Sequence, residues 1–214
     1  MKLMVLLPVL FLPAFGQSTN GPNSSPSYGI TTAPPAGSIT NYRAATESDR
    51  ARWFLNSTIG PSRLFLVGPI NAGWGTLRDV PSEYGTHWDG FGKRNGMRLT
   101  GVATGNLIEA GLGSAWGEDP RYFRSPAHGF GPRMKYVVKT TFLAPHRDGQ
   151  WHPAYARFVG NVGNNFLSNT WRADSEANPS DAVVRCVWGV LGRMTSDAFE
   201  EFWPDVKQKV LRRH

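Results

Sequence analysis

The sequence predicts an all-α protein: a compact bundle of about six helices with Gly-mediated crossings, preceded by a signal peptide and a disordered polar segment. Three observations favour this fold class. Helix start and stop signals recur along the chain after residue 43, with short loops between them. Small residues recur at a spacing of four, as Gly101 and Gly105 do, which lets a neighbouring helix approach closely. The single cysteine, Cys186, excludes an intramolecular disulfide, so packing alone must hold the domain together.

The first residues have the pattern of a secretory signal. A basic start at Lys2 precedes the apolar run 3–15, and Ala14 with Gly16 supplies a small-x-small cleavage pattern. The run is shorter than the about 20 apolar residues that span a bilayer, and a retained N-terminal anchor is the alternative. We therefore expect a signal peptide at 1–16, a disordered linker at 17–43 and a single helical domain at 44–214.

The first part of this domain contains three expected helices. Thr46 is followed by acids and then by aromatic residues, which is typical of a capped helix start. A second candidate covers 62–77, with a kink at Pro69. The dense Gly and aromatic content of 81–96 predicts a loop or a short turn of helix, and the third helix is expected at 97–116.

The remaining helices are expected over 132–143, 154–171 and 180–203. Pro204 is expected to end the last of these and to open a short terminal helix at 205–213. An all-β alternative stays open, because the many glycines and the partial alternation at 134–139 could mark strands of an outer-membrane barrel. Asparagines at a spacing of four in 154–171 favour the helical interpretation.

Two of these helices have unusual faces. The helix at 97–116 is apolar or small on nearly every side, so we expect its neighbours to enclose it. The helix at 154–171 carries a stripe of small residues and a row of asparagines, which predicts polar contacts between helices. Its apolar stripe consists of Tyr155, Phe158, Val159, Val162 and Phe166.

The net charge of the chain limits the classes of partner that the protein can be expected to bind. The chain has 23 Lys and Arg against 16 Asp and Glu, for a net charge of +7. Nucleic acid is an improbable partner for an exported protein, so anionic lipid or another envelope component is the expected one. A basic helix end that complements the helix dipole is the alternative reading of the C-terminal patch. That patch contains Lys207, Lys209, Arg212 and Arg213.

From Gly90 onward the chain carries motifs with a recognisable order: GFGKR at 90–94, GNLIEA at 105–110, EDPRYFR at 118–124 and EFWPD at 201–205. In these motifs the chain resembles a family of uncharacterised exported proteins, found mainly in acidobacteria. The resemblance covers roughly the last 125 residues and implies an exported bacterial origin. It implies no particular chemistry.

Candidate catalytic residues are few. Glu109 lies on the helix expected to be buried, where desolvation would prepare a general acid, although a structural polar network is the alternative. Asp119 is the second candidate, and its alternative role is to cap a turn that starts at the following proline. Arg121 and Arg124 could clamp a phosphate or carboxylate, or could bind helix carbonyls or Glu109. Asn106 and Asn165 are further candidate binding residues on the two unusual helices.

We expect no metal site and no cofactor, because the five histidines lack ligand spacing and the chain has no nucleotide-binding glycine loop. Two functions are compatible with these features. The first is a non-enzymatic exported envelope protein that associates with a membrane or another envelope component, as its basic end and its glycine and tryptophan pattern indicate. The second is a hydrolase or lyase acting on an envelope polymer or lipid, with Glu109 as acid and the arginine pair holding an anion.

Overall fold

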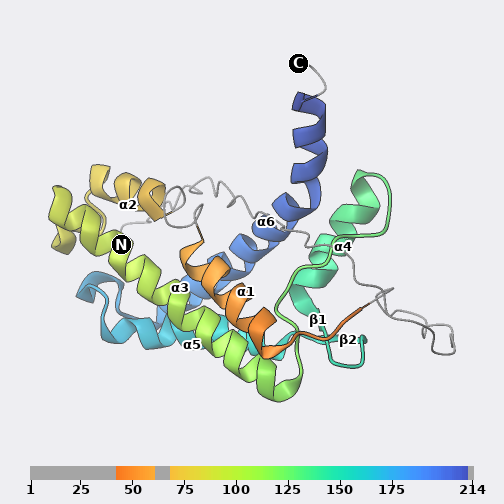
Figure 1. Cartoon of the computed structure of the whole chain (residues 1–214). Coiled ribbons are helices and arrows are strands. Elements are labelled where there is room, and N and C mark those ends of the chain that lie inside the picture. Colours follow the sequence, from red (N-terminus) through yellow and green to blue (C-terminus); the bar gives the residue numbers. More distant parts are fainter. Residues whose placement is uncertain (1–41, 61–67, 212–214) are drawn as a thin grey trace, which may run out of the picture.

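The computed structural model describes residues 42–60 and 68–211, and in this part of the chain the all-α prediction with its six helices is confirmed. The long helix α3 packs against α1, α2 and α5, and α6 packs against α4 and α5 (Figure 1). The helices are α1 (Glu47–Ile59), α2 (Gly68–Leu77), α3 (Trp88–Trp116), α4 (Phe130–Phe142), α5 (Tyr155–Leu167) and α6 (Pro179–Leu211). The 3₁₀ turns are η2 (Ser82–Tyr84), η3 (Ser168–Thr170) and η4 (Asp174–Glu176), and the strands are β1 (Leu143–Pro145) and β2 (Trp151–Pro153).

The expected signal peptide at 1–16 and the expected linker up to residue 41 lie outside the described residues. The last two linker residues, Tyr42 and Arg43, are described and contact the domain. The Tyr42 ring meets Phe123 edge-on, with 5.7 Å between ring centroids, and packs against Gly149. The Arg43 carbonyl accepts a hydrogen bond from Arg121 Nη2 at 2.7 Å. The domain therefore holds the chain from Tyr42 onward.

Helix α1 begins as predicted. The Thr46 hydroxyl accepts a hydrogen bond from the Asp49 N–H at 3.2 Å, and Asp49 Oδ2 accepts one from the Thr46 N–H at 3.0 Å. This reciprocal pair satisfies two of the backbone donors that a helix start leaves open. The second helix is described from Gly68 to Leu77 as α2. The first part of the predicted helix, 62–67, lies outside the described residues, so the kink expected at Pro69 stays a prediction.

Helix α3 begins at Trp88, so the prediction of a loop over 81–96 is wrong for its last part. A tertiary contact explains the difference. The Arg94 guanidinium donates to the carbonyl of Val80 at 2.9 Å, of Pro81 at 2.8 Å and of Gly85 at 2.5 Å, so the preceding turn is tied to the first turns of α3. The local glycine content favoured a loop, but this contact stabilises the helix.

The enclosure predicted for 97–116 is wrong for one of its sides. Leu107 is 62% exposed and Gly111 is exposed as well. The side that packs inward carries small and polar residues instead. Its buried members within the predicted helix are Gly101, Glu109 and Gly113.

The segment 134–139, whose alternation could have marked a strand, lies within α4. The sheet follows that helix. Strands β1 and β2 pair antiparallel with Ala144 opposite His152, and Gly149 takes a positive φ of 75° in the turn between them. No pattern in the sequence predicts this hairpin, since strands of three residues are too short to show a period.

Helix α6 continues through Pro204, so the predicted break into two helices is wrong. A proline inside a helix removes one N–H and displaces the preceding turn. The carbonyl of Glu201 in that turn accepts hydrogen bonds from the guanidinium groups of Arg124, at 3.1 Å, and Arg133. These two guanidinium groups lie outside α6 and donate hydrogen bonds to a carbonyl of the turn that the proline disturbs. The helix continues to Leu211.

The predicted Gly-mediated crossing joins α3 to α5. A Cβ on Gly160 would stand 2.8 Å from the Gly105 carbonyl oxygen, so α5 has no room for a side chain at this position. The apolar side chains buried at this and the other helix contacts are mostly small. They are Ala72, Val137, Ala144, Ala154, Ala156 and Ala182.

Candidate functional site

Helices α3, α5 and α6 enclose a cavity of about 350 Å³ that is partly open to solvent. Glycines of α3 and α6 make room for α5 asparagines beside it. A Cβ on Gly101 would stand 3.3 Å from Asn164 Oδ1, and one on Gly189 would stand 2.1 Å from Asn161 Oδ1. The walls are therefore built from polar side chains that reach past glycines. Its five lining arginines are Arg98, Arg157, Arg172, Arg185 and Arg193.

Glu109 lies at this cavity and is 8% exposed. Its Oε1 accepts a hydrogen bond from Arg157 Nε at 3.2 Å and stands 3.7 Å from Arg193 Nη1. Arg157 also donates to the carbonyls of Thr140, at 2.6 Å, and Thr141, at 3.2 Å, near the end of α4. Glu109 thus links α3 to α5 and α6 through ion pairs. This is the structural polar network that was the alternative to a catalytic role for Glu109.

The network continues into α6. Arg193 Nε stands 3.3 Å from Asp197 Oδ1, and its Nη2 donates to the Pro120 carbonyl at 2.8 Å. Burial raises the pKa of the Asp197 carboxyl, in spite of the neighbouring Arg193 and Arg157. Burial also lowers the pKa of Arg157, and the positive charge of Arg193 acts in the same direction. The group is a desolvated structural network in which each charge depends on its partners.

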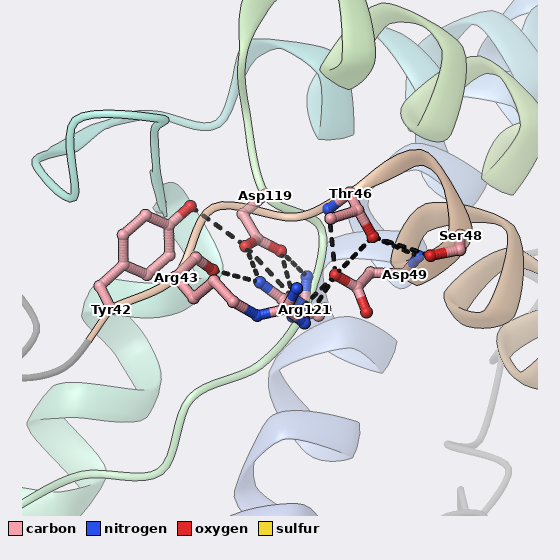
Figure 2. A network of polar contacts seen from close by, with 7 residues as sticks. All are labelled: Tyr42, Arg43, Thr46, Ser48, Asp49, Asp119 and Arg121. Carbon is pink, nitrogen blue, oxygen red and sulfur yellow. Dashed lines mark hydrogen bonds and ion pairs between the residues drawn. The ribbon is translucent and has the colours of Figure 1, made fainter. Parts of the chain in front are cut away.

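Asp119 lies in a second network, away from Glu109 (Figure 2). Its carboxylate is fully buried and accepts hydrogen bonds from the Tyr42 hydroxyl at 3.1 Å and from Arg121 Nη2 at 2.7 Å. It also accepts a hydrogen bond from the Arg121 backbone N–H at 3.0 Å. Asp119 therefore stabilises the turn that follows it, which is the capping role given as the alternative to catalysis. Figure 2 shows Arg121 between Asp119 and Asp49, whose Oδ2 lies 3.7 Å from Arg121 Nη1.

Arg124 faces a third network, on α6. Its Nη2 binds the Glu201 carbonyl and lies 3.9 Å from Asp205 Oδ1. The fully buried Glu201 carboxylate accepts hydrogen bonds from the Tyr122 hydroxyl at 2.8 Å, the Ser125 N–H at 3.0 Å and Arg133 Nε at 2.5 Å. These three donors lower the pKa of Glu201 although burial opposes the shift. The network attaches the DPRYFR segment to α6.

Glu118 was named in the same motif and has a capping role. Its two carboxylate oxygens accept the Ala156 N–H at 3.1 and 3.0 Å, in the first turn of α5. A carboxylate at a helix N-terminus satisfies open donors and interacts favourably with the helix dipole. Burial raises the pKa of this carboxyl. Its position beside α5 could not be predicted from local spacing.

The two asparagines proposed as binding residues both line the cavity. Asn106 Nδ2 donates to the Thr58 hydroxyl at 3.1 Å, and so connects α3 to α1. Asn165 Nδ2 donates to the Asn161 carbonyl at 2.8 Å and to its side-chain oxygen at 3.0 Å. Both side-chain amides therefore already donate hydrogen bonds within the protein at the edge of the cavity.

The structure brings together Glu109, Asn106 and Asn165, and it gives Arg121 and Arg124 partners elsewhere. The constellation on which the hydrolase alternative depends is therefore not formed. Sequence reasoning missed the cavity arginines, of which Arg157 and Arg185 come from α5 and α6. The one feature of the sequence that could have indicated these arginines is a charged residue on a helix that otherwise carries small and apolar residues. Within residues 42–60 and 68–211, His, Cys, Asp and Glu side chains form no group suited to a metal ion.

Outside the cavity, α5 and α6 expose apolar side chains. The predicted apolar stripe of α5 faces outward at four of its five positions, while the opposite side of the helix lines the cavity. The α5 residues are Tyr155, Val159, Val162 and Phe166, from 42 to 59% exposed, and the α6 residues are Val183, Val184, Val187 and Leu191, from 42 to 56% exposed. We call these eight residues the apolar faces.

Comparisons with known protein families, curated proteins and solved structures found no match for this chain. Among the helices of the described ranges, none combines the length and the hydropathy that crossing a membrane requires. The geometry of the site and of the apolar faces is therefore the basis for an argument about function.

Proposed function

We propose that this protein is a non-enzymatic exported envelope protein that associates with a membrane surface through the apolar faces of α5 and α6. The observation that carries the proposal is the direction of the α5 stripe. A surface helix of a water-soluble protein turns its apolar side to the core and its polar side to water. Helix α5 departs from this arrangement, since its Val159 and Val162 are exposed while its Asn161 and Asn165 line the cavity.

The interior supports the same conclusion. Buried charged side chains include Arg94, Glu109, Glu118, Arg157 and Glu201, and each has polar partners inside the domain. In a lipid environment polar groups must be satisfied internally, and apolar side chains can face outward without penalty. A bundle whose Glu109, Glu118 and Glu201 carboxylates are paired inside and whose outer faces carry apolar side chains fits the interfacial region of a bilayer.

The exposed apolar side chains support association. Moving a fully exposed Val, Leu or Phe side chain out of water is worth about 1.5–3 kcal/mol, and each of these side chains, from 42 to 59% exposed, can contribute roughly half of that. Several residues spaced three or four apart on one helix act together in this way when the helix lies in the interface plane. The net charge of +7 adds attraction to anionic headgroups. Of the C-terminal basic patch, Lys207 is exposed on α6, and the side chains of the other three residues lie outside the described part.

Export is supported by the leader pattern at 1–16 and by the resemblance to exported proteins in the motifs from Gly90 to Asp205. We expect signal cleavage near Gln17. Mass spectrometry of the protein recovered from the envelope fraction of the cells that produce it tests this expectation. Recovery of an uncleaved chain in the cytosol would contradict it.

Membrane association is tested by flotation with vesicles of phosphatidylglycerol and phosphatidylethanolamine. The variant Val159→Ser with Val162→Ser weakens the α5 face, and Val183→Ser with Val187→Ser weakens the α6 face. We expect the chain without residues 1–16 to float with vesicles and at least one of these variants to bind about tenfold more weakly. A control variant, Leu55→Ser with Ile59→Ser, removes apolar residues of equal exposure (51 and 49%) from α1 and should float like the wild type.

Two results would overturn the proposal. One is a chain that stays in the vesicle-free fraction at low ionic strength. The other is a chain whose apolar faces are covered by a second copy, which analytical ultracentrifugation would reveal as a dimer that the same serine variants dissociate. Equal loss of flotation in the α1 control would also argue against α5 and α6 as the contact.

A further inference from the structure

Two of the arginines that line the cavity between α3, α5 and α6 pair with carboxylates that are buried with them. Arg157 and Arg193 share Glu109, and Arg193 Nε also stands 3.3 Å from Asp197 Oδ1. The negative charge of Glu200 acts on Arg193 as well. Each of these two guanidinium groups therefore already has an opposite charge beside it.

The other lining arginines are engaged within the protein too. Arg172 Nη1 lies 3.3 Å from Glu176 Oε2. The charges of Glu176 and Asp181 favour the charged form of Arg185, whose Nη1 and Nη2 groups donate to backbone carbonyls at 2.8 and 3.0 Å. Arg98 also has an interaction of its own in the chain. Because these charges have partners, the cavity favours a ligand without a net charge of its own.

Two polar atoms at the cavity have no hydrogen-bond partner among the described residues. One is the Nε–H of Arg185, a donor on α6, and the other is the side-chain oxygen of Asn164, an acceptor on α5. Both atoms are buried. Proteins rarely leave buried polar groups unsatisfied, because such a group has lost the hydrogen bond that it made with water. A ligand that fits this cavity therefore accepts one hydrogen bond and donates another.

A hydroxyl group meets both requirements, because its one oxygen accepts hydrogen bonds and also donates one. A peptide divides the same two functions between separate N–H and C=O groups. Side-chain amides suit hydroxyl groups for the same reason, since each amide offers two N–H groups and an oxygen. The asparagines at the cavity are Asn106, Asn161, Asn164 and Asn165. The polar part of the lining is therefore suited to a ligand with several hydroxyl groups.

Aromatic rings form another part of the lining. Phe158 of α5 and Trp188 of α6 lie at the cavity with Val102 and Val190. The C–H groups on one face of a sugar ring are apolar and weakly positive, so they pack on the negative face of an aromatic ring. The cavity volume of about 350 Å³ is at the lower end of the range of about 300–1,000 Å³ for small-molecule sites. These features together suit a small saccharide.

We propose that this cavity binds an uncharged saccharide, whose hydroxyl groups form hydrogen bonds with the Arg185 Nε–H and the Asn164 oxygen and whose ring packs on Trp188. The site does not depend on membrane association through the apolar faces.

Saturation-transfer difference NMR of the chain without residues 1–16 tests the proposal with cellobiose, maltose and N,N′-diacetylchitobiose. We expect saturable binding of at least one disaccharide, with the strongest transfer to the C–H protons on one face of a ring. Glycerol, which has hydroxyl groups but no ring, should bind at least about tenfold more weakly. Absence of saturable binding of all three disaccharides up to about 10 mM would overturn the proposal.

Two comparison ligands test the class of the occupant. Glucuronic acid should bind no more tightly than glucose, because its carboxylate meets guanidinium groups that already have partners. Tighter binding of glucuronic acid would contradict an uncharged ligand. A trialanine peptide with blocked ends should bind more weakly than the best disaccharide, and equal or tighter binding of the peptide would overturn the saccharide site.

The decisive variants are Asn164→Leu and Trp188→Leu. Asn164→Leu keeps the branching of the side chain but removes the unsatisfied oxygen, so it should bind the best disaccharide about tenfold more weakly and have a higher Tm without sugar. Trp188→Leu should also weaken binding about tenfold, because the ring loses its aromatic contact. Trp116→Leu is the matched control, at an exposed position outside the cavity, and should bind like the wild type.

Three results with these variants would overturn the proposal. The first is unchanged binding in Asn164→Leu or in Trp188→Leu. The second is an equal loss of binding in Trp116→Leu. The third is a lower Tm in Asn164→Leu, which would show that the Asn164 oxygen is already satisfied within the protein.

These outcomes are separable from those of the flotation experiment. The serine variants of the apolar faces should keep saccharide binding, since those residues lie outside the cavity. A chain that binds a disaccharide but does not float would refute membrane association alone. A chain that floats but binds none of the disaccharides would refute the saccharide site alone.

Discussion

Gly160 of α5 packs against the backbone of α3 at Gly105, and the free space there is smaller than a methyl group. A Cβ on Gly160 would stand 2.8 Å from the Gly105 carbonyl oxygen and 3.2 Å from the Glu109 N–H nitrogen. Both neighbours are backbone atoms, which cannot rotate away. This close approach places Glu109 next to Arg157, so the helix crossing and the buried ion pair depend on the same glycine.

The first prediction concerns this crossing. Gly160→Ala should lower the free energy of unfolding by about 1–3 kcal/mol, because the two helices must separate to admit the methyl group. Urea denaturation measures the change. Gly111→Ala is the matched control: nothing lies within 4 Å of its Cβ position, and alanine should stabilise α3 by about 0.5–1 kcal/mol. Changes of the same sign in the two variants would contradict the account of the crossing.

The second prediction concerns the pairing of Glu109. Glu109→Gln keeps the size of the side chain but leaves Arg157 and Arg193 without their shared carboxylate, and should destabilise the fold by about 3 kcal/mol. Combining it with Arg157→Met should cost less than the sum of the two single changes, because each removes the partner that the other leaves unpaired. A double-mutant cycle by urea denaturation gives this coupling. Strict additivity would show that the two groups do not interact.

The third prediction is a pH dependence at the start of α1. Hydrogen bonds from Thr46, with the charges of Arg121 and Arg43, lower the pKa of Asp49 from 3.8 to about 2. A carboxyl whose pKa is lower in the folded state stabilises the fold above its unfolded pKa and loses that contribution as the pH falls. The contribution of Asp49, about 1 kcal/mol because solvent screens this surface group, should therefore be complete above about pH 4 and lost towards pH 2.

Asp49→Asn tests this dependence. The variant should be less stable at neutral pH and should show a shallower decline of unfolding free energy between about pH 4 and pH 2. Urea denaturation at a series of pH values measures both effects. An unchanged slope in that range would mean that other carboxylates account for the loss of stability in acid.

The fourth prediction concerns the attachment of residues 118–124 to α6. Tyr122→Phe removes the hydroxyl that donates to Glu201 at 2.8 Å, and should cost about 2 kcal/mol because the buried carboxylate loses one of its donors. Tyr155→Phe, at a position 59% exposed, should change stability by less than about 0.5 kcal/mol. Thermal denaturation of both variants provides the comparison. Equal losses of stability in the two variants would show that the hydrogen bond to Glu201 is not the reason for the effect of Tyr122→Phe.

Local signals predicted much of the fold. The reciprocal capping of Thr46 and Asp49 and the close approach of Gly105 and Gly160 could be foreseen, since each depends on residues a few positions apart or on residue size alone. The helical start at Trp88 and the continuity of α6 through Pro204 could not. In both places a distant arginine binds backbone carbonyls that local rules leave unsatisfied, and no pattern along the chain identifies such a partner.

The candidate site divides in the same way. The burial of Glu109 was predicted from the small and apolar composition of its helix. Its partners Arg157 and Arg193 come from α5 and α6, and their approach depends on how three helices cross. Arg121 and Arg124 stand three apart in the sequence, yet one binds Asp119 and the other binds α6, because the intervening chain is extended and not helical.

Arg94 holds the turn before α3 mainly through the main-chain oxygens of Val80, Pro81 and Gly85, and its contacts with the Thr76 hydroxyl and the Asp79 carboxylate are longer, at 3.4 and 3.5 Å. Every residue type offers a carbonyl, so these three hydrogen bonds do not depend on which side chains the turn carries. The stretch can therefore exchange its exposed residues, such as Ser82, with little effect on where α3 begins. Replacement of the one guanidinium would release three backbone positions together. A single side chain thus makes the neighbouring segment free to vary in evolution while it is itself irreplaceable.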